Sequence, residues 1–281
     1  MEILGVYNIK GGVGKTTTAV NLAYRSAAEG WRTLLWDLDP QAASTYILRR
    51  RAKIKVRVKE LMRGDASTSD LIKETDYPNL DLLPSDFSYR HFDERFGEKR
   101  NPAKQLLKLM IPLHRTHACL VLDCAPGISV IAENILHAAD ALIVPLAPSP
   151  LSVRTLRQLV DFLDERQWHD LALMPFFSMI DRRRNLHKET AEQLRAEFPF
   201  ILRTEVPYNA AFEQVAVRRA PVEVFAPRSP AAEIYRSLWR EIDERLTSLS
   251  SARATPSTAA AVTDMAADSD FVGSPWSAGR A

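Results

Sequence analysis

Residues 8–18, with the sequence NIKGGVGKTTT, combine the residue types that bind a polyphosphate. An apolar run at residues 3–9 predicts a strand before this segment, and residues 15–30 have a helical pattern. A strand that passes through a glycine-rich turn into a helix directs backbone N–H groups and the positive end of the helix dipole at one point, which suits an anion. Glycine lets the backbone approach a phosphate closely because it has no Cβ. The segment has three such residues, Gly11, Gly12 and Gly14.

The end of this segment matches the phosphate-loop pattern G-x-x-x-x-G-K-[ST], but its beginning does not. Lys15 can reach the β- and γ-phosphates of a nucleotide, and the hydroxyl of Thr16 can bind Mg²⁺. Ile9 stands where the pattern has its first glycine, and Lys10 is a second lysine that the ordinary pattern does not require. The alternative is a glycine-rich turn with a solvent-exposed lysine, and the strand before and the helix after argue against it.

Two further apolar runs end in aspartates that could complete a magnesium site. Residues 32–39 end in Asp37 and Asp39, and residues 118–124 place Asp123 directly after an apolar strand. Mg²⁺ binds oxygen ligands, and ligands of open α/β sheets bind at the carboxyl ends of the strands. An aspartate that caps a turn is the alternative for each run. Together with the loop, however, the runs favour a nucleotide–magnesium site at this edge.

These residues require a sheet whose strands end at one edge, and the rest of the chain fits such a sheet. Near-continuous apolar strands that alternate with helical patterns predict an α/β fold, a mostly parallel twisted sheet with helices on both faces. The expected strands are residues 3–9, 32–39, 79–84, 118–124, 141–146, 171–178 and 201–206. The expected helices are residues 15–30, 102–110, 130–139, 152–165, 186–198, 209–217 and 230–246.

The composition is that of a soluble globular protein, with 46% hydrophobic and 26% charged residues in a chain of 281. No apolar run approaches the roughly 18–20 residues that cross a bilayer, and residues 1–4 show no signal-peptide pattern. Cys119 and Cys124 fall on opposite faces of one expected strand, which disfavours a disulfide or a shared metal. We therefore expect a cytoplasmic protein.

A change of composition near Leu246 predicts two regions. Residues 1–247 are expected to form one domain. Residues 248–281 are rich in Ala, Ser and Thr and have no periodicity, so we expect a disordered tail.

Three segments carry a resemblance to a known family. KGGVGKTT at residues 10–17, DLDPQ at 37–41 and LVLDCAPG at 120–127 resemble the deviant Walker A, A′ and B motifs of the ParA family of partition ATPases. Further segments, among them FSMIDRR and VPYN, follow in the order of the family, and the resemblance covers residues 3–245. It implies a P-loop NTPase fold, with ATP and Mg²⁺ as cofactors and ATP hydrolysis as the reaction.

The resemblance also implies a role for each site residue. Lys10 corresponds to a signature lysine that reaches across a dimer interface to the phosphates of the other subunit. Asp39 would position or activate the attacking water. Thr16 and Asp123, with Asp39, would hold Mg²⁺, and Asp37 is a weaker candidate for either task. The catalytic residues implied are Lys10, Lys15 and Asp39. The nucleotide-binding residues implied are Lys10, Gly11, Gly12, Val13, Gly14, Lys15, Thr16 and Thr17, with Pro207 and Asn209 at the adenine.

The sequence departs from the family pattern at several points, and these limit the members of the family that it resembles. Tyr208 stands where relatives commonly have Arg. No helix-turn-helix segment precedes the first strand, so the chain resembles the short type. MinD-type regulators end in a basic amphipathic helix that lies on a membrane, whereas this chain ends in a polar, weakly acidic segment. The expected partners are a second copy of the chain in the presence of ATP, non-specific DNA, and a ParB-like or cargo-adaptor protein that stimulates hydrolysis, with no membrane.

Three groups of basic residues could contact a nucleic-acid backbone. Clustered Lys and Arg bind phosphates without regard to sequence, although an ordinary solvated face is the alternative for each group. In the first group, residues 49–59, the segment KIKVRVK at 53–59 alternates in a way that fits an exposed edge strand, so we favour the two later groups. The favoured candidates are Arg182, Arg183, Arg184, Arg218 and Arg219.

The resemblance therefore implies an ATPase that dimerises with ATP, binds DNA non-specifically and positions plasmid, chromosome or protein cargo on the nucleoid. The alternative is a metabolic P-loop enzyme of the synthetase or ligase kind with the same fold. Such an enzyme should need a substrate pocket with its own acid and base groups, and the sequence indicates none.

Overall fold

The computed structural model describes residues 1–48, 60–61, 65, 67–86, 89–90, 102–168 and 170–254. The strands are β1 (Glu2–Val6), β2 (Thr33–Asp37), β3 (Lys73–Glu74), β4 (Leu80–Leu83), β5 (Cys119–Asp123), β6 (Ala141–Leu146), β7 (Ala172–Ile180) and β8 (Val206–Pro207). The helices are α1 (Lys15–Ala28), α2 (Ala43–Leu48), α4 (Thr68–Leu71), α6 (Pro102–Met110), η2 (Ile111–Arg115), α7 (Val130–Ala138), α8 (Pro150–Glu165), α9 (Asn185–Glu197), α10 (Ala210–Arg218), α11 (Val222–Phe225) and α12 (Pro230–Ala254).

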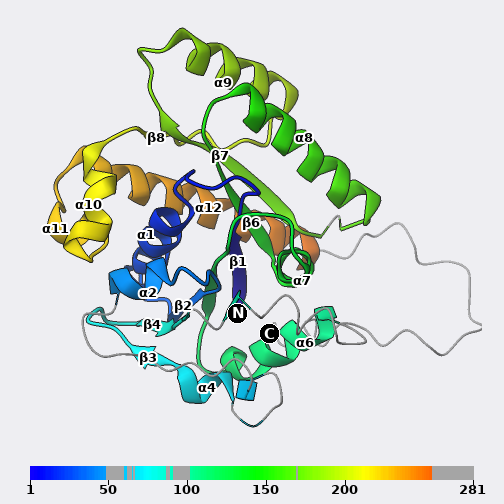
Figure 1. Ribbon diagram of the computed structural model, residues 1–281, viewed down its shortest axis with the longest axis vertical. Helices are drawn as coiled ribbons and strands as arrows, with labels where there is room; N and C mark the ends of the chain where they lie inside the picture. Colours follow the sequence, from blue (N-terminus) through cyan, green and yellow to red (C-terminus); the bar gives the residue numbers. More distant parts are fainter. Residues whose placement is uncertain are drawn as a thin grey trace, which may run out of the picture.

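The strands of this part of the chain form one sheet in the order β3-β4-β2-β5-β1-β6-β7-β8. Neighbouring strands are parallel, apart from the antiparallel pair of β3 and β4 at one edge. Helices lie on both sides of the sheet (Figure 1). The α/β fold predicted from the sequence is therefore confirmed. The phosphate loop follows β1 at the centre of the sheet, between β5 and β6.

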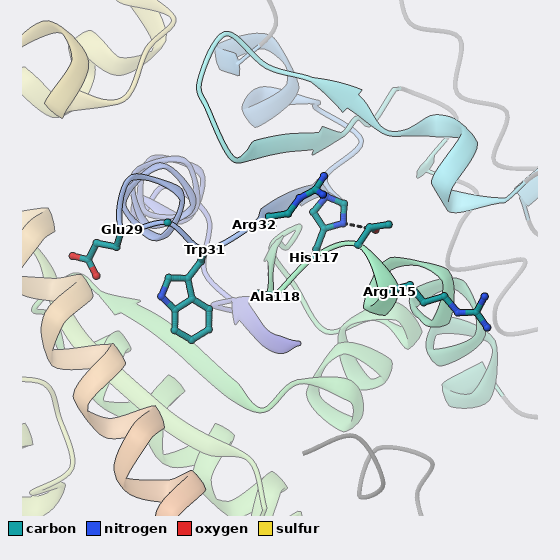
Figure 2. A pocket seen from close by; sticks show the side chains of 8 residues that line it. Glu29, Trp31, Arg32, Arg115, His117 and Ala118 are labelled. Atoms are coloured by element: carbon teal, nitrogen blue, oxygen red, sulfur yellow. Dashed lines mark hydrogen bonds between the residues drawn. The ribbon is translucent and has the colours of Figure 1, made fainter. Parts of the chain in front are cut away.

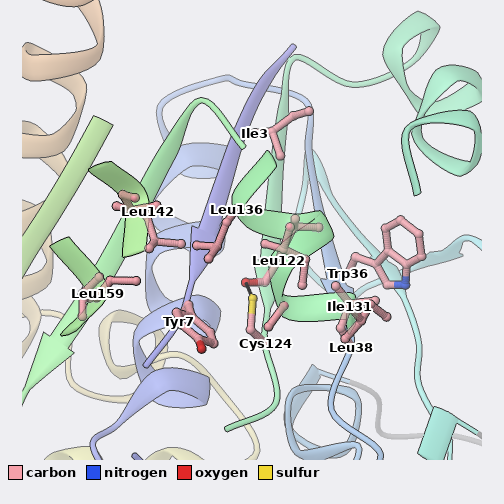
Figure 3. Packing of buried hydrophobic residues seen from close by; sticks show 14 of the residues in the cluster. Ile3, Tyr7, Trp36, Leu38, Leu122, Cys124, Ile131, Leu136, Leu142 and Leu159 are labelled. Atoms are coloured by element: carbon pink, nitrogen blue, oxygen red, sulfur yellow. Dashed lines mark hydrogen bonds between the residues drawn. The ribbon is translucent and has the colours of Figure 1, made fainter. Parts of the chain in front are cut away.

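Side chains alternate along the strands and so divide the core into two clusters. On β1, Ile3 points into one cluster and Leu4 into the other. Helices α6, α7, α8 and α9 cover the first cluster, and Figure 3 shows Leu122 of β5, Ile131 of α7 and Tyr7, which follows β1, among its residues. Helices α1, α2, α10, α11 and α12 cover the second cluster. The two faces thus bury both surfaces of every central strand, which explains their near-continuous apolar sequences.

Cys119 and Cys124 are both free and buried, and they belong to opposite clusters. The expectation that they form neither a disulfide nor a shared metal site is consistent with this geometry.

The strand expected at residues 201–206 is wrong, since only Val206–Pro207 form β8. The backbone N–H groups of Arg203 and Thr204 donate instead to the carboxylate of Glu241 on α12, at 2.7 and 3.0 Å. Because a side chain from a distant helix takes these donors, they cannot enter a sheet ladder.

Several short elements were not expected from the sequence: α2, α4, β3, η2 and α11. Each is only a turn or two of helix, or a pair of residues at the edge of the sheet. Such elements are too short to show a period. The edge strand expected within residues 49–59 lies outside the described residues and stays a prediction.

Helix α12 is longer than the sequence indicated. It runs to Ala254, past residue 247, where we expected the domain to end. Residues 255–281, which make up the rest of the expected tail, lie outside the described residues. No helix of the described chain is long and apolar enough to cross a membrane.

Candidate nucleotide and magnesium site

The phosphate loop connects β1 to the first turn of α1 through left-handed glycines. Gly12 and Gly14 have φ values of 71° and 89°, a region that residues with a Cβ rarely adopt. A Cβ on Gly14 would also lie 3.2 Å from the hydroxyl of Ser178. Gly14 is the N-cap of α1, and no side chain caps this helix. Its first N–H groups therefore remain available to an anion, as the sequence predicts.

Lys15, at the start of α1, is buried, and its ammonium donates a hydrogen bond to the carbonyl oxygen of Lys10 at 3.0 Å. Burial lowers the pKa of Lys15, and the nearby charge of Asp123 opposes this shift. Within the described residues, the ammonium of Lys10 itself has no hydrogen-bond or ion-pair partner. The two lysines of the loop thus differ: Lys15 points into the loop, and Lys10 lies half-buried at its rim.

Asn8 fixes the base of the loop and was not predicted as a site residue. Its amide donates to the carbonyl of Pro145 on β6 at 2.8 Å, and its side-chain oxygen accepts from the backbone N–H of Lys10 at 2.8 Å. The only signal in the sequence was its position directly before the loop. Its partner Pro145 is far away along the chain.

Asp123 supplies the most direct indication of a cation. It is fully buried at the end of β5, the hydroxyl of Thr16 lies 3.4 Å from its Oδ1, and its Oδ2 has no hydrogen-bond partner. Burial and then the neighbouring charge of Asp37 raise the pKa of Asp123 well above its usual range. A buried, unpaired carboxylate oxygen beside a hydroxyl is what a bound Mg²⁺ would satisfy.

The donor set fits Mg²⁺ that shares its ligands with a nucleotide. Among the described residues, no group of three or more His, Cys, Asp or Glu side chains could hold a metal by itself. Mg²⁺ in nucleotide sites uses one or two carboxylates, waters and the phosphates of the substrate. Thr16 and Asp123 therefore provide the share that the protein would supply.

Asp37 and Asp39 are separated by only one residue but face different surroundings. Asp39 is half-buried, and its Oδ1 accepts from the backbone N–H of Gln41 at 2.8 Å. Its charge is one of those that oppose the effect of burial on the pKa of Lys15. Asp37 is fully buried and bound to Thr45 of α2, and burial raises its pKa to about 6 against the effect of these hydrogen bonds.

The residues expected at the adenine line a small cleft beside the loop. This cleft of about 120 Å³ includes Gly14, Thr17, Pro207 and Asn209. The side chain of Asn209 caps α10, since its oxygen accepts from the N–H of Ala211 at 2.8 Å. The structure thus brings the VPYN segment to the phosphate loop.

Tyr208, which stands in place of the common arginine, is 63% exposed and donates its hydroxyl to Glu213 at 2.9 Å. Glu213 also lines the cleft.

The candidate DNA residues are exposed to different degrees. Arg182 and Arg183 have side chains that are 78% and 89% exposed, paired with Glu205 and Asp181. Surface pairs of this kind are weak and can be exchanged for phosphate contacts. Arg184 and Arg218 are also exposed.

Arg219 is different from the other four. Its Nε donates to the carbonyl of Tyr46 on α2 at 2.8 Å, and its guanidinium lies 4.5 Å from the centre of the Tyr46 ring. Arg219 is therefore engaged with the protein itself. Of the basic group at residues 49–59 the structure describes nothing.

A larger hollow of about 520 Å³ lies at the opposite edge of the sheet, among the residues that precede β2 and β5. Figure 2 shows that Arg32 and Arg115 point in different directions there. His117 is buried and bound to Asp81 and Thr116, at 3.0 and 2.9 Å. Ligands of open α/β sheets bind at the carboxyl ends of strands, so this hollow does not compete with the phosphate loop.

Comparisons with known proteins show the family. A family model described as an AAA domain matches residues 1–179. The sporulation initiation inhibitor protein Soj of Bacillus subtilis (strain 168) is 29% identical over 247 residues, 86% of this chain and 98% of Soj. The chromosome partitioning protein ParA of Caulobacter vibrioides (strain NA1000 / CB15N) is 29% identical over 256 residues, 87% of this chain and 95% of ParA.

Solved structures share the fold. Cobyrinic acid a,c-diamide synthase from Mycobacterium smegmatis, with a bound ATP analog and magnesium, superposes with a TM-score of 0.73 and 25% sequence identity. The match covers 88% of this chain and 96% of the synthase.

Proposed function

Since this chain belongs to the ParA-type partition ATPases of the AAA-domain family, we propose that it uses ATP hydrolysis to position a DNA or protein cargo. The observation that carries the proposal is the convergence of Lys15, Thr16 and the unpaired Oδ2 of Asp123 at the open N-terminus of α1. These groups suit the phosphates and the magnesium ion of one bound ATP.

In this proposal the phosphates lie against the N-terminal N–H groups of α1. Lys15 exchanges its hydrogen bond to Lys10 for the β- and γ-phosphates. Thr16 and Asp123 would hold Mg²⁺, which would supply positive charge beside the phosphate oxygens. Pro207 and Asn209 contact the adenine.

A second copy of the chain completes the site. Lys10 lies at the rim of the loop, and its ammonium has no partner among the described residues, so it is free to reach phosphates bound by another subunit. Phosphoryl transfer is accelerated mainly by positioned positive charge. Asp39, half-buried in the segment that follows β2, would orient the attacking water. The active species is then a dimer that forms with ATP.

Non-specific DNA is the proposed surface on which the dimer acts. Arg182, Arg183, Arg184 and Arg218 are exposed cations that a dimer would present twice, and such contacts bind phosphates without sequence preference. The named relatives include a chromosome partitioning protein. A second protein, ParB-like or a cargo adaptor, would stimulate hydrolysis on the nucleoid.

The second candidate is a metabolic enzyme, and one observation favours it: the fold likeness to an amide-forming synthase. The cleft beside the loop measures only about 120 Å³ and is lined by Pro207 and Asn209, the residues proposed at the adenine. Among the described residues that line this cleft, Glu213 is the one carboxylate, and it accepts a hydrogen bond from Tyr208. The partition ATPase is therefore the better supported function.

ATP hydrolysis by the purified chain separates the two candidates. We expect slow turnover with MgATP alone and faster turnover when non-specific duplex DNA and a protein captured on the ATP-bound dimer are added. Lys15→Ala provides the inactive control. A requirement for a small carboxylic acid and an ammonia donor, with no response to DNA, would instead establish the metabolic enzyme.

A further inference from the structure

We infer that Asp37 is a positioning residue, whose carboxylate clamps the loop between β2 and α2 and thereby holds Asp39 toward the phosphates. This inference rests on the proposed function, because it takes Asp39 as the residue that orients the attacking water. It assigns to Asp37 neither of the two tasks that the family resemblance suggested.

The carboxylate of Asp37 joins both ends of the loop. Its Oδ1 accepts a hydrogen bond from the backbone N–H of Asp39 at 3.1 Å, where the loop begins. Its Oδ2 accepts from the backbone N–H and from the hydroxyl of Thr45, at 2.8 and 2.7 Å, in the first turn of α2. Because Asp37 is fully buried, water does not compete for these bonds.

The neighbouring Asp123 differs from Asp37 in having a carboxylate oxygen that is available to a magnesium ion. Asp37 and Asp123 stand opposite each other in the pairing of β2 and β5, and both are fully buried. Asp123 has an oxygen without a partner, whereas both oxygens of Asp37 are bound to the loop and to α2. The metal site therefore lies on Asp123.

The clamp is anchored beyond the loop. The hydroxyl of Thr45 also accepts from the backbone N–H of Ser85, which follows β4, at 3.0 Å. The next residue of α2 is Tyr46, and its backbone carbonyl accepts a hydrogen bond from the side chain of Arg219, the C-cap of α10. These two contacts fix α2. The position of the loop between β2 and α2 then depends on the hydrogen bond from the N–H of Asp39 to Asp37.

The loop needs such a link because its backbone is not relaxed. Ala42 has a φ of 52°, in the left-handed region that favours glycine, and its N–H donates to the carbonyl of Asp39 at 2.9 Å. A residue in this region persists when its surroundings impose it. Loss of the Asp37 clamp would let the turn relax and move the carboxylate of Asp39.

The hydrogen bonds of Asp37 go to Asp39 and Thr45 and to none of the groups that would bind the phosphates or the base, although Asp37 stands beside the proposed magnesium ligand Asp123. Lys15 and Thr16 belong to α1 and Pro207 to β8, so relaxation of the loop leaves them in place. The clamp therefore acts on turnover and not on ATP affinity, and it acts only through Asp39. These two properties distinguish a positioning residue from a ligand of Mg²⁺ or phosphate.

The test compares Asp37→Asn, Asp39→Ala and the double variant by ATP affinity and by single-turnover hydrolysis. Asparagine keeps the shape of Asp37 but replaces one carboxylate oxygen with an NH₂ group. This donor then faces an N–H or O–H group whose hydrogen bond the carboxylate accepts in the wild type. We expect ATP affinity to stay within about threefold of the wild type and turnover to fall at least about tenfold. The double variant should be no slower than Asp39→Ala alone, because both changes remove the same function.

Thr45 provides a matched pair that does not alter the buried carboxylate. Thr45→Val removes the hydroxyl that donates to Asp37 and should slow turnover, and Thr45→Ser keeps the hydroxyl and should restore it. Circular dichroism checks that each variant is folded. This pair also tests the inference if Asp37→Asn fails to fold.

The outcomes separate the inference from the proposed function. Wild-type turnover of Asp39→Ala would remove the role of Asp39 and overturn both. A slow Asp39→Ala together with wild-type turnover of Asp37→Asn and Thr45→Val would overturn the clamp alone. If Asp37→Asn lost ATP affinity to the same extent as turnover, Asp37 would be a binding residue and the clamp would be overturned. If the double variant were slower than Asp39→Ala by the full factor of Asp37→Asn, Asp37 would act independently of Asp39, which would also overturn the clamp.

Discussion

The ammonium of Lys15 lies 3.0 Å from the carbonyl oxygen of Lys10, so the two lysines of the phosphate loop are joined through the backbone of one and the side chain of the other. The side chain of Lys10 takes no part in this contact. A substitution at Lys10 therefore leaves the partner of Lys15 in place, and the two lysines can be tested separately.

Lys15→Ala should weaken ATP binding strongly while the fold stays intact. A hydrogen bond to a charged group contributes about 1.5–3 kcal/mol, so affinity should fall by about tenfold or more. The melting temperature should change little, because burial already disfavours the charged form of Lys15. Calorimetric titration with ATP is the measurement, and Lys188→Ala, at an exposed lysine, is the control. Unchanged affinity would contradict the assignment of the loop.

Lys10→Ala should bind ATP but not hydrolyse it as a homodimer, because each site then lacks the lysine of the other subunit. Addition of Asp39→Ala subunits should restore part of the activity. In such a mixed dimer, one site has both its own Asp39 and a Lys10 from its partner. Turnover should be greatest near equal amounts of the two variants. Full activity of the Lys10→Ala homodimer, or no gain on mixing, would exclude action across an interface.

Asp39→Ala should accumulate the ATP-bound dimer, since nucleotide then bridges two subunits without being cleaved. Size-exclusion chromatography with MgATP is the measurement, and the same run with ADP is the control. A monomer at micromolar protein with ATP would count against the dimer.

The sequence was sufficient to predict the features that depend on local patterns. Lys15, Thr16 and Asp123 follow directly from a strand–loop–helix pattern and a strand-end acid, and the structure brings them together. The functions of Asn8 and Asp37 could not be predicted, because their partners belong to other elements. A single sequence does not show which distant donor will meet a given side chain.

The wrong strand at residues 201–206 has the same cause. Its apolar residues are buried as predicted, with Ile201 and Leu202 in the two core clusters. The pattern therefore indicated burial correctly. Glu241, from a helix that comes later in the chain, decided where the backbone hydrogen bonds go.

Glu241→Ala should destabilise the fold in a way that depends on pH. Burial alone would raise the pKa of Glu241, but the N–H groups of Arg203 and Thr204 and the Thr204 hydroxyl lower it below its usual value of 4.5. A lowered pKa means that the carboxylate stabilises the fold above pH 4.5 and loses this effect as the pH falls through the folded-state pKa. Loss of the carboxylate should cost about 1–3 kcal/mol at neutral pH.

Urea unfolding of Glu241→Ala at pH 7 and in acid is the measurement. The difference from wild type should be large at neutral pH and shrink in acid. Glu244→Ala, at an exposed position on the same helix, is the matched control and should change little. Equal destabilisation by the two variants would contradict the role of Glu241.

DNA binding should depend on ATP, ignore sequence and weaken with salt. Each neutralised phosphate adds about −0.9 to the slope of log affinity against log salt, and a dimer doubles the contacts of each exposed arginine. Arg184→Glu and Arg218→Glu should therefore weaken binding and flatten this slope. Arg240→Glu, at an exposed site on α12, makes the same charge change and should have a smaller effect.

Arg219 distinguishes a DNA contact from a structural one. Its guanidinium already binds Tyr46 of α2, next to the Thr45 that holds Asp37. Arg219→Glu should thus lower ATP turnover even without DNA, whereas Arg218→Glu should leave basal turnover unchanged. The measurement is a titration of labelled duplex at several salt concentrations, with ATP and with ADP, beside an ATPase assay. Equal DNA affinity with both nucleotides would contradict the proposed switch, because only the ATP-bound dimer presents both copies of the arginines. Absence of binding at low salt would remove DNA from the mechanism, since electrostatic contacts are strongest there.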